Sequence, residues 1–205
     1  MIKNIVFDMG NVLLNYDPNV CLDYFLESDE DKKMIMDELF QGPEWVKGDR
    51  GLLTDEEIYL HVKKRLPKRL HSALKNCVFE WHMCMKPIVG AKEFCEYVKS
   101  EGYKIYVLSN ASNTFYDYFP ERFAPLSYFD GVVVSSDIHM IKPEREIYTY
   151  LLEKYQLTPE ESFFIDDRPE NIEGARAAHM NGAVFNGDFR EMEKTIINLD
   201  QGIDE

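Results

Sequence analysis

The 205-residue chain is poor in cysteine and has no long apolar runs. Four cysteines in a chain of this length do not make the dense framework of a disulfide-stabilised fold, so we expect reduced thiols and a cytoplasmic protein. No apolar stretch approaches the roughly 20 residues that a membrane-spanning helix needs. The first apolar run meets Asp8 too early to resemble the hydrophobic region of a secretory signal.

Basic residues are also scarce. Lysine and arginine number 23 against 37 aspartates and glutamates, which gives a formal net charge of −14. Such a chain lacks the basic surface that attracts nucleic acid or an anionic membrane, so we predict neither as a partner. A small anionic substrate is not excluded, because a metal ion and a lysine can dominate the potential of a local site. The 45% hydrophobic and 13% aromatic residues are enough for a folded core.

Short runs of β-branched and aromatic residues indicate the strands of a buried sheet. The runs are nearly continuous rather than alternating, which is typical of strands covered on both faces of a parallel sheet. The expected strands cover residues 5–7, 104–108, 131–134, 162–165 and, more weakly, 183–185. Helical patterns separate them, over residues 88–101, 143–151 and 169–180. This alternation predicts an α/β fold with a doubly wound, mainly parallel sheet.

One interval breaks the alternation and contains helical patterns only. The expected helices in it cover residues 18–28, 30–40, 54–66 and 68–85. Thr54 and Glu57 have the spacing of a capping box at the start of the third. An interval of about 70 residues is much longer than an ordinary connection between a strand and a helix. We therefore expect a helical cap, residues 15–87, inserted after the first strand into a core made of residues 1–14 and 88–205.

Polar side chains follow the expected strands at their carboxyl ends, where open parallel sheets bind their ligands. The set is Asp8 after the first strand, Ser109 and Asn110 after the second, Lys142 downstream of the third, and Asp166 and Asp167 after the fourth. Carboxylates packed together repel one another, and a bound divalent cation is the usual way to keep them ionised. A hydroxyl and an ammonium group suit phosphate oxygens. These residues therefore predict a site for magnesium and phosphate.

The same residues lie in four motifs that occur in order: IVFDMGNV, VLSN, IKPEREIY and FFIDDRPENIEGA. With them the chain resembles the haloacid dehalogenase-like (HAD) hydrolase superfamily over its whole length, the helical cap included. Within the superfamily, the motifs are most similar to those of sugar-phosphate phosphatases such as α-D-glucose-1-phosphate phosphatase, and then to the amino-terminal phosphatase domains of epoxide hydrolases. The resemblance implies a HAD-like Rossmannoid fold and a Mg²⁺-dependent phosphatase of a small phosphorylated metabolite, with sugar phosphates as the expected substrates.

The resemblance also implies a role for each site residue. Asp8 would be the catalytic nucleophile, forming an aspartyl-phosphate, and would also bind the metal. Lys142 would be catalytic and substrate-binding, because its charge neutralises both the phosphate and Asp8. The remaining roles are phosphate binding by Ser109 and the backbone beside Asn110, direct metal binding by Asp167, metal binding by the carbonyl of Gly10, and either a second metal contact or an outer one by Asp166.

Gly10 is the position where the chain departs from the family. HAD phosphatases usually carry an aspartate there, which protonates the leaving group and then activates water. Its absence is expected to slow turnover by about 10²–10⁴-fold, and less for leaving groups of low pKa. Asn11, Asn15 and Asp17 are candidates for placing a water or a proton instead. The alternative interpretation is a catalytically weak phosphate-binding or phospho-acceptor protein, although receiver-like modules usually place the acidic pair at the first strand.

Two aromatic groups have no assigned role in these motifs. Trp45 and Trp81 lie in the expected cap, where they are candidates for an apolar wall against a sugar. The second group is expected in the core or at a subunit contact of a protein that is a monomer or homodimer. Its members are Phe115, Tyr116, Tyr118, Phe119 and Phe123.

Overall fold

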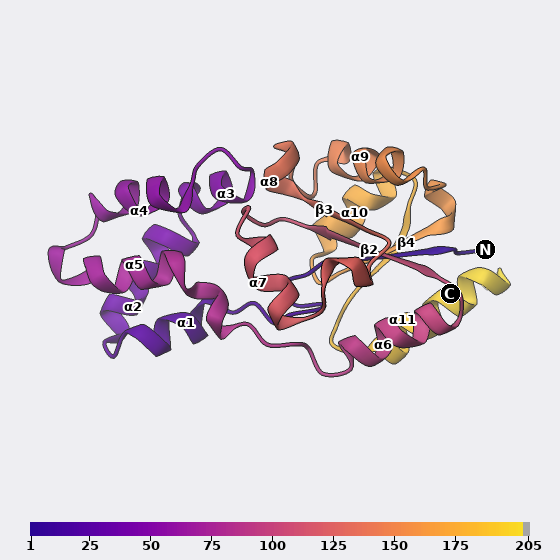
Figure 1. Cartoon of the computed structure of the whole chain (residues 1–205), viewed down its shortest axis with the longest axis horizontal. Coiled ribbons are helices and arrows are strands. Elements are labelled where there is room, and N and C mark those ends of the chain that lie inside the picture. The colour runs from indigo at the N-terminus through magenta and orange to yellow at the C-terminus, as the bar shows by residue number, and fades with distance from the viewer. Residues whose placement is uncertain (203–205) are drawn as a thin grey trace.

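A computed structural model describes residues 1–202 of the chain (Figure 1). Its centre is a five-stranded sheet with the order β3-β2-β1-β4-β5, in which every neighbouring pair is parallel. The strands are β1 (Asn4–Phe7), β2 (Lys104–Ser109), β3 (Gly131–Val134), β4 (Ser162–Asp166) and β5 (Asn181–Val184). The chain winds outward from β1 in both directions, which confirms the predicted doubly wound α/β fold.

Both faces of the sheet are covered by helices, as the continuous apolar runs predicted. Helices α6 (Ala91–Ser100) and α11 (Phe189–Gln201) cover one face, and α9 (Arg145–Tyr155) and α10 (Pro169–Ala177) cover the other (Figure 1). Successive strand residues point to opposite faces. Val6 therefore packs under α9 and α10, whereas its neighbours on β1 pack under α6 and α11.

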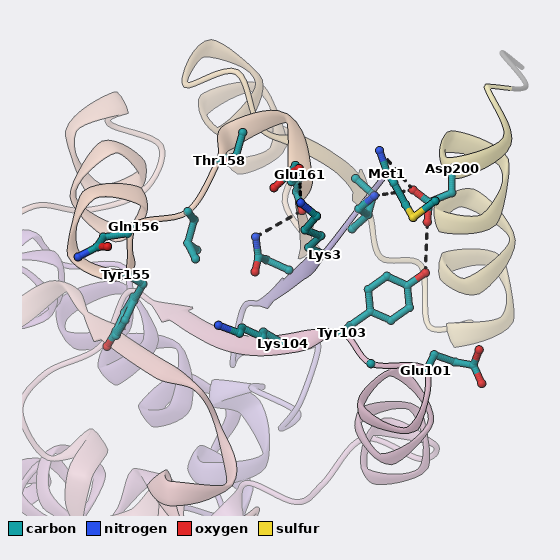
Figure 2. Close-up of a pocket in the computed structure, with 14 residues that line it drawn as sticks. Met1, Lys3, Glu101, Tyr103, Lys104, Tyr155, Gln156, Thr158, Glu161 and Asp200 are labelled. Carbon is teal, nitrogen blue, oxygen red and sulfur yellow. Dashed lines mark hydrogen bonds and ion pairs between the residues drawn. The ribbon is translucent and has the colours of Figure 1, made fainter.

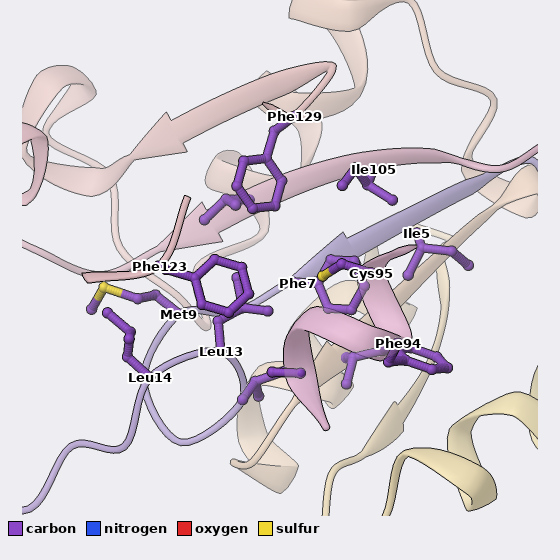
Figure 3. Close-up of a cluster of buried hydrophobic side chains, with 14 of the residues drawn as sticks. Ile5, Phe7, Met9, Leu13, Leu14, Phe94, Cys95, Ile105, Phe123 and Phe129 are labelled. Atoms are coloured by element: carbon purple, nitrogen blue, oxygen red, sulfur yellow. The ribbon is translucent and has the colours of Figure 1, made fainter. Parts of the chain in front are cut away.

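The larger of the two sheet clusters lies under α6. Figure 3 shows Ile5 and Phe7 of β1 beside Phe94 and Cys95 of α6, and the rings of Phe7 and Phe94 meet edge to face at 6.1 Å. The aromatic residues around α7 (Phe115–Arg122) extend this cluster. The buried ones are Phe115, Tyr118, Phe119 and Phe123, whereas Tyr116 is exposed. Four of these five aromatic residues are therefore core residues, which was the first of the two places expected for them.

The segment between β1 and α6 is helical. It contains α1 (Pro18–Phe25), α2 (Asp29–Ile35), α3 (Pro43–Asp49), α4 (Asp55–Lys63) and α5 (His71–Phe79), with a π-helical turn at Met36–Phe40. These helices have a hydrophobic cluster of their own, which includes Leu22, Leu39 and Leu74. In Figure 1 they lie beyond the carboxyl ends of the strands, at the opposite end of the molecule from the N-terminus. The division into a cap of residues 15–87 and a core remains a prediction.

The helix boundaries differ from the expectations in several places. The capping box is present, because Glu57 N donates to Thr54 Oγ1 at 3.3 Å and Thr54 N donates to Glu57 Oε2 at 2.9 Å. Helix α3 was not predicted; Gly42 precedes it, and Pro43 and Gly48 lie within it. The pattern over 30–40 divides into an α-helix and a π-helical turn, and the pattern over 68–85 divides into an α-helix flanked by 3₁₀ turns. Helix α9 begins at Arg145, two residues after the proline at which it was expected to begin.

Strand β5 begins at Asn181, two residues before the expected start. Asn181-Gly182 reads as a turn in the sequence, but here the glycine serves close packing. A Cβ on Gly182 would lie only 2.7 Å from the carbonyl oxygen of Phe164 on β4. In the part of the chain that the structure describes, no helix is both long and apolar enough to span a bilayer. All four cysteines are free thiols.

Candidate active site

Three carboxylates meet at the carboxyl ends of the two central strands. Asp8 directly follows β1, and Asp166 ends the neighbouring β4, with Asp167 next in the chain. Phe7 of β1 is in register with Ile165 of β4, and Asp8 N donates to the Ile165 carbonyl at 2.9 Å. Carboxylate oxygens of Asp8, Asp166 and Asp167 therefore lie within 4.8 Å of one another.

Lys142 lies between two of these carboxylates. Its Nζ is 2.5 Å from Asp8 Oδ1 and 2.7 Å from Asp166 Oδ2, and its side chain is only 1% exposed. Burial by itself would lower the pKa of Lys142, but the charges and hydrogen bonds of Asp166 and Asp8 outweigh it and raise that pKa. The ammonium group therefore stays protonated beside Asp8 at neutral pH.

One ammonium group does not neutralise three carboxylates. Burial raises the pKa of Asp8 to about 7; the charge of Lys142 opposes this shift, and those of Asp166 and Asp167 add to it. Burial is also the main cause that raises the pKa of Asp167. The cluster is thus short of positive charge, which a divalent cation with its preference for carboxylate oxygens would supply. The donor set therefore fits a magnesium ion.

Asp166 and Asp167 differ in how their oxygens are used. Asp166 is fully buried and accepts hydrogen bonds from Lys142 Nζ, from Arg168 N at 2.9 Å, and from Asn171 Nδ2 at 2.9 and 3.0 Å to its two oxygens. Asp167 is half-buried, and Asn11 Nδ2 donates to it at 3.1 Å. Asp167 therefore keeps more of its oxygen lone pairs available than Asp166 does.

Asn171 was not predicted, although it lies in the quoted motif of α10. Replacing Asn171 by alanine should destabilise the fold by about 1–3 kcal/mol, because a buried carboxylate loses its amide donor. Urea unfolding measures this as a lower midpoint. Asn19→Ala is the matched control, since Asn19 is exposed and its amide contacts only Asp17. Equal midpoints for the two variants would show that Asp166 does not depend on Asn171.

Ser109 and Asn110 at the end of β2 lie in different surroundings. The Ser109 hydroxyl is buried and has no hydrogen-bond partner among the described residues. The Asn110 side chain donates to the Lys142 carbonyl at 3.0 Å and accepts from Lys142 N at 2.8 Å. Asn110 thus holds the loop that carries the lysine, a function that the sequence did not reveal. The Ser109 hydroxyl therefore has an unused hydrogen-bonding capacity at the end of β2.

Gly10 lines the site, but the fold does not require a glycine there. A Cβ at this position would lie 3.7 Å from Tyr16 Cβ and 3.9 Å from Asp8 Oδ2, both of which are ordinary contact distances. Its backbone does not adopt a positive φ. The site therefore has room at position 10 for the start of a side chain that this chain does not have.

A cavity of about 440 Å³ lies over the carboxylates, between the strand ends and the helices that follow β1. Trp45 and Trp81 both line it, with ring centroids 5.5 Å apart, and Tyr16 packs on Trp81 at 5.6 Å. The further lining residues from this helical segment are Phe40, Val46 and Asp49. The sequence pointed to the two tryptophans. Asp49 was not found, because it ends the helix α3 that was not predicted.

A second cavity of about 500 Å³ lies at the other end of the sheet, near the starts of β1 and β2 (Figure 2). Several of its polar groups contact one another. Lys3 Nζ contacts Glu161 Oε1 at 2.6 Å, and Tyr103 donates to Asp200 at 3.4 Å. Among the described residues, the group that could hold a metal ion is the trio at the carboxyl ends. The carboxyl-end cavity is therefore the candidate active site.

The family model of haloacid dehalogenase-like hydrolases matches residues 2–179 of the chain. A phosphorylated carbohydrates phosphatase of Thermotoga maritima is 29% identical, over 85% of this chain and 80% of that protein. A sesquiterpene phosphatase of Aspergillus oryzae is 24% identical over 88% of each. A HAD family enzyme of Bacteroides thetaiotaomicron, solved with magnesium and inorganic phosphate, is 25% identical with a TM-score of 0.70, over 94% of this chain and 99% of that one.

Proposed function

Because the chain belongs to the haloacid dehalogenase-like hydrolase family, we propose that it is a Mg²⁺-dependent phosphatase of small phosphorylated metabolites, with sugar phosphates as its substrate class. One observation carries the proposal: a buried lysine bridges the carboxylate after β1 and the carboxylate at the end of β4. The relatives named as phosphatases support it, as does the structural neighbour that binds magnesium and phosphate.

Asp8 and Asp167 are the carboxylates that would bind magnesium directly, together with the backbone carbonyl of Gly10. Asp166 would not bind the metal directly, because its oxygens already accept hydrogen bonds from Lys142, Arg168 and Asn171. Bound magnesium would offset the excess negative charge of the cluster and polarise the phosphoryl oxygens. Of the two roles that the sequence left open for Asp166, we thus propose the outer one.

The protein residues then divide the reaction between them. A carboxylate oxygen of Asp8 attacks phosphorus, and the bond from phosphorus to the leaving oxygen breaks, which gives an aspartyl-phosphate. The Lys142 ammonium and the unpartnered Ser109 hydroxyl bind phosphoryl oxygens as charge develops on them. Asn110 keeps Lys142 in place through its two bonds to the lysine backbone. Water then hydrolyses the aspartyl-phosphate and regenerates Asp8.

The substrate class rests on the cavity wall. Aromatic rings of Tyr16, Trp45 and Trp81 line the cavity, and faces of sugar rings pack on aromatic rings. The same wall suits the ester of an apolar alcohol, and this observation supports a second candidate class that agrees with the sesquiterpene phosphatase relative. We keep sugar phosphates as the proposal and terpenyl phosphates as the second candidate.

Phosphate release from a panel of phosphate esters, with and without magnesium, tests the proposal. Removal of the metal with EDTA should lower the rate at least about tenfold, and added MgCl₂ should restore it. Calcium is the control ion, because its larger coordination shell fits an octahedral site poorly. Release that is unchanged in EDTA would contradict the magnesium requirement.

The same panel separates the substrate classes. Glucose 1-phosphate and ribitol 5-phosphate represent the sugar and polyol phosphates, and farnesyl phosphate represents the apolar esters. A higher kcat/KM for the first two supports the proposal, whereas a higher value for farnesyl phosphate supports the second candidate. Stoichiometric labelling of Asp8 without release of phosphate would instead support the alternative of a phospho-acceptor protein.

A further inference from the structure

The proposed reaction needs a proton donor and a base, and Gly10 has no side chain to serve as either. Three carboxylic acids are among the residues that line the cavity: Asp8, Asp167 and Asp49. The first two belong to the trio that holds the nucleophile and the metal. We propose that Asp49, at the end of α3, is the general acid and base of this phosphatase. This inference rests on the proposed function.

The position of Asp49 is fixed by contacts between the helical segment and the rest of the chain. Ser135, directly after β3, donates to the Asp49 carbonyl at 2.5 Å. The next residue, Arg50, donates to both oxygens of Glu144, at 3.0 and 2.5 Å. Glu144 lies two residues after Lys142, so the loop that carries the lysine also anchors the residue beside Asp49.

The chain after Asp49 also lies very close to the residues that follow β3. Gly51 has a φ of +70°, and a Cβ there would lie 2.2 Å from the carbonyl oxygen of Ser136. His139 Nδ1 lies 2.9 Å from the carbonyl oxygen of Arg50. Position 51 therefore requires a glycine, because other residues rarely adopt this φ and because a Cβ would collide with the carbonyl oxygen of Ser136. These contacts hold the backbone at and after Asp49, whose side chain lines the same cavity as Asp8, and a general acid needs such a fixed position.

The protonation of Asp49 suits the role. Burial raises the pKa of Asp49 to about 8; the charge of Asp55 raises it further, and that of Lys142 lowers it. Burial and the charge of Asp49 both raise the pKa of Tyr16 and of Tyr118, so these phenols stay neutral. An acid that holds its proton near neutral pH and can lose it there is suited to both halves of the reaction.

Each step balances. When Asp8 attacks phosphorus, the bond to the leaving oxygen breaks, and that oxygen takes the proton of the Asp49 carboxyl. In the second step the Asp49 carboxylate accepts a proton from water, whose oxygen forms a bond to phosphorus. The bond between phosphorus and Asp8 breaks, which releases phosphate and returns Asp8 as a carboxylate and Asp49 as an acid.

The test is Asp49→Asn, assayed with two kinds of ester. With a substrate of the sugar-phosphate panel, whose alkoxide needs a proton, kcat should fall by about 10²–10⁴-fold. With p-nitrophenyl phosphate, whose leaving group needs none, the variant should release a burst of about one nitrophenol per enzyme and then turn over slowly. Asp37→Asn, an exposed carboxylate of the same helical segment, is the control and should behave as the wild type.

A second variant tests the role by rescue. Gly10→Asp in the Asp49→Asn background should restore at least tenfold of the lost kcat, because position 10 has room for a side chain beside Asp8. Loss of activity that is equal for both esters, without a burst and without rescue, would overturn the assignment of Asp49. That outcome leaves the proposed function intact, provided that the wild type shows magnesium-dependent release that Asp8→Asn abolishes.

The raised pKa of Asp49 can be checked by measuring how the stability of Asp49→Asn depends on pH. The pKa of Asp49 is raised from 3.8 to about 8 in the folded state, so the wild type loses stability as pH rises between these values. Asparagine does not ionise, and Asp49→Asn should therefore gain stability relative to the wild type from pH 5 to pH 8. A variant that is less stable at pH 8 than at pH 5, relative to the wild type, would contradict the raised pKa of Asp49.

Discussion

Replacing Asp8 by asparagine should abolish magnesium-dependent release of phosphate from p-nitrophenyl phosphate, a loss of about 10⁴-fold or more. The amide has nearly the shape of the carboxylate but lacks the charged oxygen that attacks phosphorus. It also removes one of the two carboxylates that have lone pairs free for the metal. The neighbouring Asp166 cannot take over the attack, because its oxygens are engaged by Lys142 and Asn171.

Two measurements make this result specific. Mass spectrometry of wild-type enzyme quenched during turnover should find one phosphoryl group on the peptide that contains Asp8, and none in Asp8→Asn. Asp137→Asn is the matched control: Asp137 follows β3 at the same edge of the sheet, but it contacts Tyr116 and does not line the cavity. Activity that survives in Asp8→Asn would rule out the covalent mechanism.

The fold could be predicted wherever the sequence pattern reflects burial on both faces. The apolar runs of β1 to β4 are continuous because helices cover both sides of the sheet, and this surrounding is visible in the residue types themselves. Helix α3 was missed and the start of strand β5 was expected two residues late, because the glycines there have a role in packing. Gly182 allows two backbones to approach, whereas in the sequence it reads only as a turn signal.

The charged residues of the site were also predictable, but the residues that hold them in place and the acid from the helical segment were not. Asp8, Lys142, Asp166 and Asp167 lie at strand ends or in a loop next to them, so topology alone brings them to one edge. Asn171 and Asn110 act through hydrogen bonds across sequence separations of 5 and 32 residues. No periodicity records such pairings.

Asp49 is a stronger example of the same limit. Its place in the lining of the cavity depends on how the helical segment contacts the rest of the chain, through Ser135 and through the pair formed by Arg50 and Glu144. Contacts of this kind join residues more than 80 positions apart, and each partner alone reads as an ordinary surface residue. The absence of an acid at position 10 was visible in the sequence, whereas the residue that replaces it could be proposed only from the fold.

Replacing Lys142 by methionine should destabilise the protein by about 3–5 kcal/mol, because two buried carboxylates lose the charge that compensates them. The side chain of Lys142 is 1% exposed, and those of Asp8 and Asp166 are 11% and 0% exposed, so water cannot take its place. The rate of phosphate release should also fall, by about 10²–10³-fold, since one charged donor to the phosphoryl oxygens is removed. Both effects have the same origin in this single buried ammonium group.

Urea unfolding in EDTA gives the first quantity, because an added cation would partly replace the missing charge. Adding magnesium should then recover a larger share of the stability in Lys142→Met than in the wild type. Lys33→Met is the control. Lys33 forms an exposed ion pair with Asp37, 2.6 Å from Nζ to Oδ2, and exposed pairs contribute about 0–1 kcal/mol to stability. Lys142→Met as stable as Lys33→Met would mean that the cluster does not depend on the lysine for its charge balance. The site would then have to hold Asp8 in its protonated form, in which it cannot attack phosphorus.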